Sequence, residues 1–201
     1  MPLNADFEDG FSADAAGVAD GVKLAVAAGV AGISIEDSVG PRLAARSAAP
    51  LFALDMAVER MRAARKAIDQ AGGDVLLIGR AECFLVGQPD IDLTVARLRA
   101  YADAGADCLY APGIRTEEHI RKVVEAVHPR PVNLLVSGPI DLTLARIADL
   151  GVRRVSVGGA LARAAWGGFM QAAQRIAEAG RFDGLAQGAS GRTLNELFEG
   201  T

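Results

Sequence analysis

The feature that most restricts the fold of this 201-residue chain is a strand-then-helix unit that occurs six times in succession. Each unit begins with a short and almost continuous apolar segment, and a longer helical segment follows it. The expected strands cover residues 1–7, 30–35, 75–78, 108–110, 131–136 and 155–157. Strands that are apolar on both faces are usually buried on both faces, as in parallel sheets covered by helices. The sequence therefore predicts an α/β fold with a parallel sheet.

Two architectures fit this repeat, an open doubly wound sheet and a (β/α)₈ TIM-type barrel. Polar residues stand at or near the C-terminal ends of five successive strands: Asp6, Glu8, Glu36, Asp37, Arg80, Glu82, Tyr110 and Asn133. An open sheet concentrates its site at one switch point, whereas a barrel brings every strand end to one rim, so the barrel is favoured. A full barrel needs eight strands and typically about 250 residues, so we predict that the first two βα units are lacking here.

The expected organisation is one N-terminally truncated barrel domain over residues 1–201, with a C-terminal helix extension. The tail, from about residue 180 to residue 201, is expected to contact a neighbouring subunit of a homodimer or homotetramer.

Composition excludes several classes of protein. Hydrophobic residues make up 51% of the chain and charged residues 23%, which is typical of a chain with a packed core. The formal net charge is −4 and no basic run occurs, so we expect no nucleic-acid partner. No apolar run approaches the length of a membrane span and no export signal is visible, so no membrane partner is expected. Two widely spaced cysteines indicate reduced thiols and a cytoplasmic protein.

The acidic residues near the start of the chain suggest a metal site. Asp6 and Glu8 stand two apart, so on a strand they would share one face, just before the turn pair Asp9-Gly10. Two neighbouring carboxylates repel, and a divalent cation commonly keeps such a pair ionised. A solvated acidic turn is the alternative. The next strand also ends in two acids, Glu36 and Asp37, and such oxygen ligands suit Mg²⁺, or Mn²⁺, better than zinc.

Further strand ends carry residues suited to a carboxylate substrate. Arg80 can hold a carboxylate through two hydrogen bonds, although an internal salt bridge to Glu82 or Glu36 is the alternative and both could coexist. Asn133 can donate a hydrogen bond to a developing enolate oxygen. These residue types point to a 2-oxo acid that chelates the metal and forms an enolate when a neighbouring C–C or C–P bond breaks.

At these positions the chain resembles the isocitrate lyase/phosphoenolpyruvate mutase superfamily. The similar stretches follow the order of that family along nearly the whole chain: residues 5–11 (ADFEDGF), 32–37 (GISIED), 78–82 (IGRAE), 104–107 (AGAD), 131–133 (PVN) and 150–158 (LGVRRVSVG). The resemblance implies a barrel, Mg²⁺, a small 2-oxo acid or phosphonopyruvate as substrate, and subunits that exchange C-terminal helices.

The resemblance also implies the roles of single residues. Asp6 would ligate the metal, and Glu8 and Glu36 would hold it mainly through water. Arg80 would bind the substrate carboxylate. We therefore expect catalytic roles for Arg80, Asn133 and Glu36, and substrate contacts from Arg80, Asn133 and Glu82.

The chain departs from the family pattern in two places. Residues 38–50 contain no Cys, Lys, His or Asn, although the lyases and mutases of the family carry motifs with such residues in that loop. Ala111 stands where several members have a histidine. The expected function is thus a Mg²⁺-dependent lyase, decarboxylase or mutase. A catalytically impaired or non-enzymatic barrel is the alternative, and a phosphosugar-binding barrel that uses Gly158-Gly159 is a third reading.

Overall fold

The computed structural model describes residues 1–40 and 50–199 of the chain. The chain divides into two compact units, Met1–Ser156 and Val157–Thr201. In the described part, no helix is both long enough and apolar enough to cross a membrane. The expectation that all 201 residues act as one barrel domain stays a prediction.

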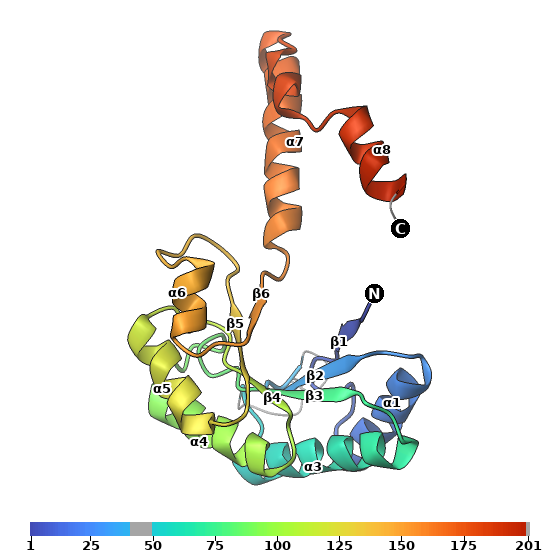
Figure 1. Ribbon diagram of the computed structural model, residues 1–201, viewed down its shortest axis with the longest axis vertical. Coiled ribbons are helices and arrows are strands. Elements are labelled where there is room, and N and C mark those ends of the chain that lie inside the picture. Colours follow the sequence, from blue (N-terminus) through green and yellow to red (C-terminus); the bar gives the residue numbers. More distant parts are fainter. Residues whose placement is uncertain (41–49, 200–201) are drawn as a thin grey trace. The chain divides into compact units, whose positions relative to one another are not determined.

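The first unit is built on one parallel six-stranded sheet (Figure 1). Its strands are β1 (Asn4–Asp6), β2 (Gly32–Glu36), β3 (Leu76–Arg80), β4 (Cys108–Tyr110), β5 (Val132–Leu135) and β6 (Arg154–Ser156). Each strand pairs in parallel with the next one along the chain. This sequential order without a switch point forms a half-barrel, consistent with the predicted TIM-type fold. That two further βα units are lacking stays a prediction.

Helices connect the strands and lie along one side of the sheet in Figure 1. They are α1 (Ala15–Ala27), α3 (Leu54–Ala71), α4 (Ile91–Asp103), α5 (Glu117–Val127) and the short α6 (Leu144–Asp149). Their starts are encoded locally, because the side chains of Asp14, Asp90, Thr116 and Thr143 each accept a hydrogen bond from a backbone N–H of the first turn. α3 ends at Gly72, which adopts the left-handed conformation that glycine tolerates best.

The core lies between the sheet and these helices. Ile33, Leu77, Leu109 and Leu134 of the strands are fully buried in one cluster with the inner faces of the helices. The alternate strand positions face the other side of the sheet, where Ile78, Cys108 and Tyr110 form a second, smaller cluster. Helices thus cover one face of the sheet, and the opposite face carries the alternate side chains of the strands, Tyr110 among them.

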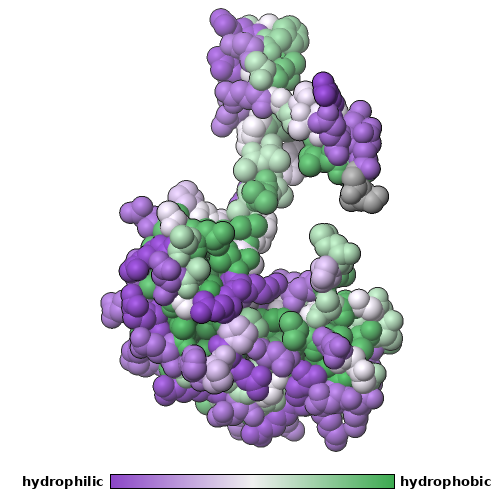
Figure 2. Space-filling model, in the orientation of Figure 1, coloured by the Kyte–Doolittle hydropathy of each residue, from purple (hydrophilic) through white to green (hydrophobic). Residues whose placement is uncertain are grey.

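The second unit is helical and consists of α7 (Ala160–Ala179), the 3₁₀ segment η1 (Asp183–Gln187) and α8 (Gly191–Glu199). No residue of α7 is buried within the single chain. Exposed apolar side chains on this unit include Leu161, Trp166, Phe169 and Met170, and hydrophobic colouring runs along α7 in Figure 2. An uncovered apolar surface of this kind often marks a contact with another protein.

Candidate functional site

The strand register places three of the predicted site residues, together with Tyr110, in one row. Glu36 lies beside Arg80, Arg80 beside Tyr110, and Tyr110 beside Asn133. Side chains at paired positions of neighbouring strands point to the same face of the sheet. The row therefore crosses four strands, at the last residue of β2, β3 and β4 and at the second residue of β5.

Arg80 is the centre of this row. Its Nη1 lies 2.8 Å from Oδ1 of Asp6, and its Nη2 lies 3.1 Å from Oε2 of Glu36. Oε1 of Glu82 accepts hydrogen bonds from Nε and Nη2 of Arg80, at 3.0 and 2.9 Å. The guanidinium also lies over the ring of Tyr110, 4.9 Å from its centroid. One arginine thus gathers three carboxylates from β1, β2 and the segment after β3.

Burial and these charges shift the pKa values at the site. Burial raises the pKa of Glu82 to about 7, although Arg80 opposes the rise. Burial also raises the pKa of Glu36, against a hydrogen bond from Ser38 and the charge of Arg80. Burial would lower the pKa of Arg80. The negative charges of Glu82, Glu36 and Asp6 have the larger combined effect, so the pKa is raised. Arg80 stays charged, whereas Glu82 is poised to change its protonation state near neutral pH.

Asn133 lies at the far end of the row and is fully buried. Its amide nitrogen donates a hydrogen bond of 2.9 Å to the hydroxyl of Ser156, at the end of β6. Its Oδ1 has no hydrogen-bond partner among the residues that the structure describes. Burial raises the pKa of the Tyr110 phenol, although the charge of Arg80 and a hydrogen bond with Ser156 oppose the rise. The sequence interpretation missed Ser156, although its place at a strand end was the same signal that identified Asn133.

Glu8 and Asp37 do not lie as the strand pattern suggested. β1 ends at Asp6, and Glu8 follows with a φ of 45°, so the alternation that would pair its face with Asp6 does not extend to it. The carbonyl of Glu8 instead accepts a hydrogen bond from the backbone N–H of Glu36. The Asp37 side chain is 99% buried and contacts the helix side of the sheet through Arg97. Neither carboxylate joins the three acids around Arg80.

The donor set for a metal ion is smaller than expected. Within residues 1–40 and 50–199, no group of three or more acidic, histidine or cysteine side chains is arranged to hold a metal ion. Asp6 and Glu36 do come together, because both contact Arg80. Mg²⁺ commonly binds through one or two carboxylates and keeps several waters, so this pair fits its chemistry. The role of Glu8 as a metal ligand stays a prediction.

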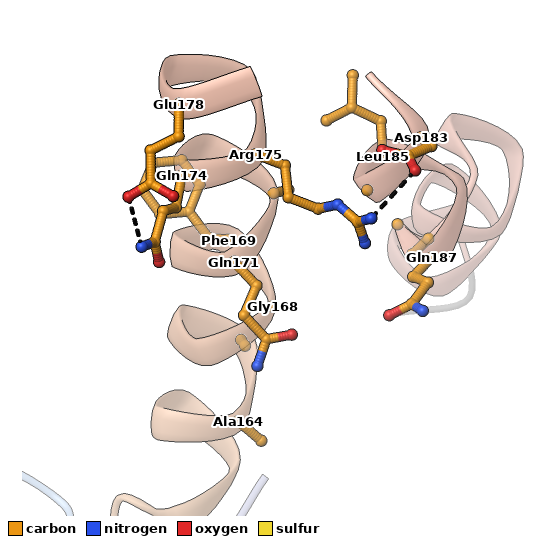
Figure 3. A pocket seen from close by; sticks show the side chains of 15 residues that line it. Ala164, Gly168, Phe169, Gln171, Gln174, Arg175, Glu178, Asp183, Leu185 and Gln187 are labelled. Atoms are coloured by element: carbon orange, nitrogen blue, oxygen red, sulfur yellow. Dashed lines mark hydrogen bonds and ion pairs between the residues drawn. The ribbon is translucent and has the colours of Figure 1, made fainter. Parts of the chain in front are cut away.

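Two other sequence-based hypotheses concern different parts of the chain. Of the loop of residues 38–50, residues 41–49 lie outside the described residues. Gly158 and Gly159 precede α7 in the second unit, and their phosphate role stays a prediction. That unit also contains a hollow between α7 and η1, which the sequence did not predict (Figure 3). Its polar side chains include Arg175, which reaches Asp183 at 3.2 Å, and none of the predicted site residues lines it.

Comparison with known proteins identifies the group to which the chain is similar. The family model described as phosphoenolpyruvate phosphomutase matches residues 1–177. Oxaloacetate decarboxylase of Pseudomonas aeruginosa is 34% identical over 162 residues, which cover 80% of this chain and 54% of that protein. The chain therefore spans about half the length of the curated relatives it matches.

Solved structures agree with this grouping. A protein of Burkholderia cenocepacia J2315, provisionally named a lyase/mutase, is 44% identical with a TM-score of 0.89, and the match covers 98% of this chain and 69% of that one. Oxaloacetate acetylhydrolase, solved with its product oxalate, is 27% identical with a TM-score of 0.78, over 98% of this chain and 66% of that one. Since the family model covers most of its length, the chain belongs to the phosphoenolpyruvate phosphomutase family, within the PEP mutase/isocitrate lyase superfamily.

Proposed function

We propose that this protein is a Mg²⁺-dependent lyase or decarboxylase, or a mutase, that acts on a small 2-oxo acid through an enolate. The observation that carries the proposal is Arg80, which lies between two acids suited to Mg²⁺ and in one row with Asn133. The names of the relatives support the same class, because they include an oxaloacetate decarboxylase and an oxaloacetate acetylhydrolase. Mn²⁺ is an alternative metal of similar ligand preference.

Five residues at the site have a task in this proposal. Asp6 and Glu36 would hold Mg²⁺, which when bound supplies a Lewis acid that polarises the 2-oxo group of the substrate. Arg80 would exchange an acidic partner for the carboxylate of the substrate, which it can bind through two N–H groups. Asn133 would donate an N–H to the oxygen on which negative charge develops. Glu82 would orient Arg80 and contact the bound acid.

Binding of oxalate, which mimics the enolate, tests the proposal directly. We expect millimolar Mg²⁺ and oxalate together to raise the melting temperature of the protein, and each alone to raise it less, because ligands that bind only the folded state stabilise it. Asp6→Ala should abolish the joint effect. The proposal fails if the wild-type protein shows no joint stabilisation and no turnover of oxaloacetate.

A catalytically impaired or non-enzymatic barrel is the second candidate. It is favoured by the absence of Cys, Lys, His and Asn from residues 38–50. Such a protein would bind Mg²⁺ and oxalate weakly or not at all, and oxaloacetate would decay at the rate of the buffer. Turnover that Asp6→Ala removes would rule this candidate out.

The proposal also includes an assembly of several copies of this chain. The apolar side chains of α7 would be covered in a homodimer or homotetramer, in which the tail of about residues 180–201 contacts a neighbouring subunit. A cytoplasmic location and a single barrel domain that lacks the first two βα units belong to this proposal as well. No nucleic-acid or membrane partner is part of it.

A further inference from the structure

We propose that Asp37, Arg97 and Tyr101 form a positioning unit that holds Arg80 in place through Glu82. None of the three touches the predicted substrate position, so they are positioning residues and not catalytic ones. The effect on substrate affinity rests on the proposed function, whereas the effect on the orientation of Arg80 does not.

The contacts of Asp37 use both of its carboxylate oxygens. Oδ1 accepts a hydrogen bond of 2.8 Å from the backbone N–H of Glu82. Oδ2 accepts one of 2.6 Å from the hydroxyl of Tyr101 and one of 3.1 Å from Nη1 of Arg97. All four residues are buried, so these hydrogen bonds are shielded from water and are strengthened by charge.

The same unit also binds the backbone of Phe52, shortly before α3. The backbone N–H of Phe52 donates to the carbonyl of Asp37 at 2.9 Å, and the carbonyl of Phe52 accepts from Nη2 of Arg97 at 3.0 Å. The end of β2, the segment just before α3 and the middle of α4 are therefore joined through Asp37 and Arg97.

Glu82 transmits this arrangement to Arg80. Asp37 holds the backbone of Glu82, and the Glu82 carboxylate accepts from two nitrogens of Arg80. This pairing directs the remaining nitrogen, Nη1, toward Asp6. Small errors in the orientation of a substrate-binding group cost much of its effect, so the loss of a remote support is felt at the site.

Asp107 provides a matched control within the same chain. Its Oδ2 also accepts from a backbone N–H, that of Leu77, and from an arginine on a helix, Arg65, both at 2.8 Å. Leu77 lies near the start of β3, whereas Arg80 ends it, so this second carboxylate supports the opposite end of the same strand. Asp37→Asn and Asp107→Asn would both reduce the stability of the protein, but only Asp37 is connected to Arg80 through Glu82.

The first test observes Arg80 itself by NMR of the full-length protein, without any ligand. The Nε–H signal of Arg80, assigned by its loss in Arg80→Lys, should move or broaden in Asp37→Asn and stay in place in Asp107→Asn. An unchanged signal in Asp37→Asn, or an equal change in both variants, would overturn the proposal. If Asp37→Asn does not fold, Tyr101→Phe is observed instead, since it removes only one hydroxyl, and an unchanged signal there counts equally against the proposal.

The second test measures the Kd of oxalate in the presence of Mg²⁺. We expect it to rise about tenfold in Asp37→Asn and by a smaller factor in Tyr101→Phe, as found for supporting residues around other binding groups, and to stay unchanged in Asp107→Asn. In turnover assays Asp37→Asn and Tyr101→Phe should raise KM more than they lower kcat. If the wild type binds no oxalate while the Arg80 signal still responds to Asp37→Asn, the proposed function fails and the positioning unit stands. If oxalate binds equally well to all variants, the unit does not position Arg80.

Discussion

At the scale of single residues, the site joins one guanidinium to more negative charge than it can neutralise. Asp6, Glu36 and Glu82 all contact Arg80, and their exposure differs widely. The side chain of Asp6 is 67% exposed and that of Glu82 only 5%. A cation would therefore meet Asp6 first, while the buried Glu82 remains the partner that fixes Arg80.

The buried Glu82 should make the stability of the protein depend on pH. Its pKa is about 7 in the folded protein against a usual 4.5, so the folded state binds the proton more tightly than the unfolded state. The stabilisation is complete below pH 4.5 and is lost as the pH rises through about 7, at most about 3 kcal/mol. Glu82→Gln lacks this dependence.

Urea unfolding at pH 5, 6, 7 and 8 checks the Glu82 prediction. The stability of the wild type relative to Glu82→Gln should fall steadily across this range. Glu125→Gln, at an exposed position of α5, controls for the loss of one surface charge. A constant difference between wild type and Glu82→Gln would contradict the raised pKa.

Asn133 should matter for chemistry more than for stability. Oδ1 of Asn133 has no hydrogen-bond partner in the described part of the structure. Asn133→Leu, which keeps a similar side-chain volume, therefore costs little hydrogen bonding. With Ser156→Ala added, both partners of the Asn133–Ser156 hydrogen bond are removed, and Tyr110 loses its hydrogen bond with Ser156. We expect the double variant to lose about 10²-fold in kcat on oxaloacetate, as for the loss of one donor to a developing oxyanion. A melting temperature near that of the wild type together with full activity would exclude the assigned role.

At the scale of elements, β3 and α4 approach closely at Gly79. A Cβ at this position would lie 3.1 Å from Cβ of Tyr101 and 3.2 Å from Cβ of Ala106. Both neighbours are fully buried, so neither can move without disturbing the core. The absence of a side chain at Gly79 therefore allows the helix that carries Tyr101 to reach the strand that carries Arg80.

Gly79→Ala should destabilise the protein by about 1–3 kcal/mol, the usual effect of added volume in a packed core. Gly138→Ala is the matched control, because nothing lies within 4 Å of a Cβ at that position. Denaturant unfolding of both variants measures the difference. Equal stabilities would show that β3 and α4 have room to separate.

The elements were largely predictable, because apolar strands and polar strand ends are properties of local sequence. Residues 32–36 and 76–80 form strands that overlap the expected ranges, and Arg80 ends its strand as the pattern predicted. Asn133 lies one residue inside the start of β5, and the register of the sheet brings it into the row of Arg80. The face of Glu8 was not predictable, because it depends on where β1 stops and on a left-handed turn residue. The burial of Asp37 was not predictable either, since Arg97 and Tyr101 are 60 and 64 residues away in sequence.

At the scale of the whole molecule, α7 presents apolar side chains that the proposed assembly would cover. Trp166, Phe169 and Met170 are each more than 60% exposed and are spaced so that they share one face of the helix. The rings of Trp166 and Phe169 pack edge to face, 5.4 Å between centroids. A second copy of the chain would cover this apolar surface, which is the association expected in the proposed homodimer or homotetramer.

Trp166 is the only tryptophan of the sequence, so its fluorescence reports on this surface alone. On dilution we expect its emission to shift to longer wavelength, as water reaches the indole, over the concentration range in which sedimentation shows dissociation. Phe169→Glu with Met170→Glu should give a monomer whose emission is already shifted at high concentration, because burying two charges at an apolar contact is unfavourable. Leu24→Glu introduces a charge at an equally exposed leucine of α1 and should leave the assembly intact. A wild-type protein that sediments as a monomer at every concentration, or a Leu24→Glu variant that dissociates as readily as the α7 variant, would remove α7 as the subunit contact.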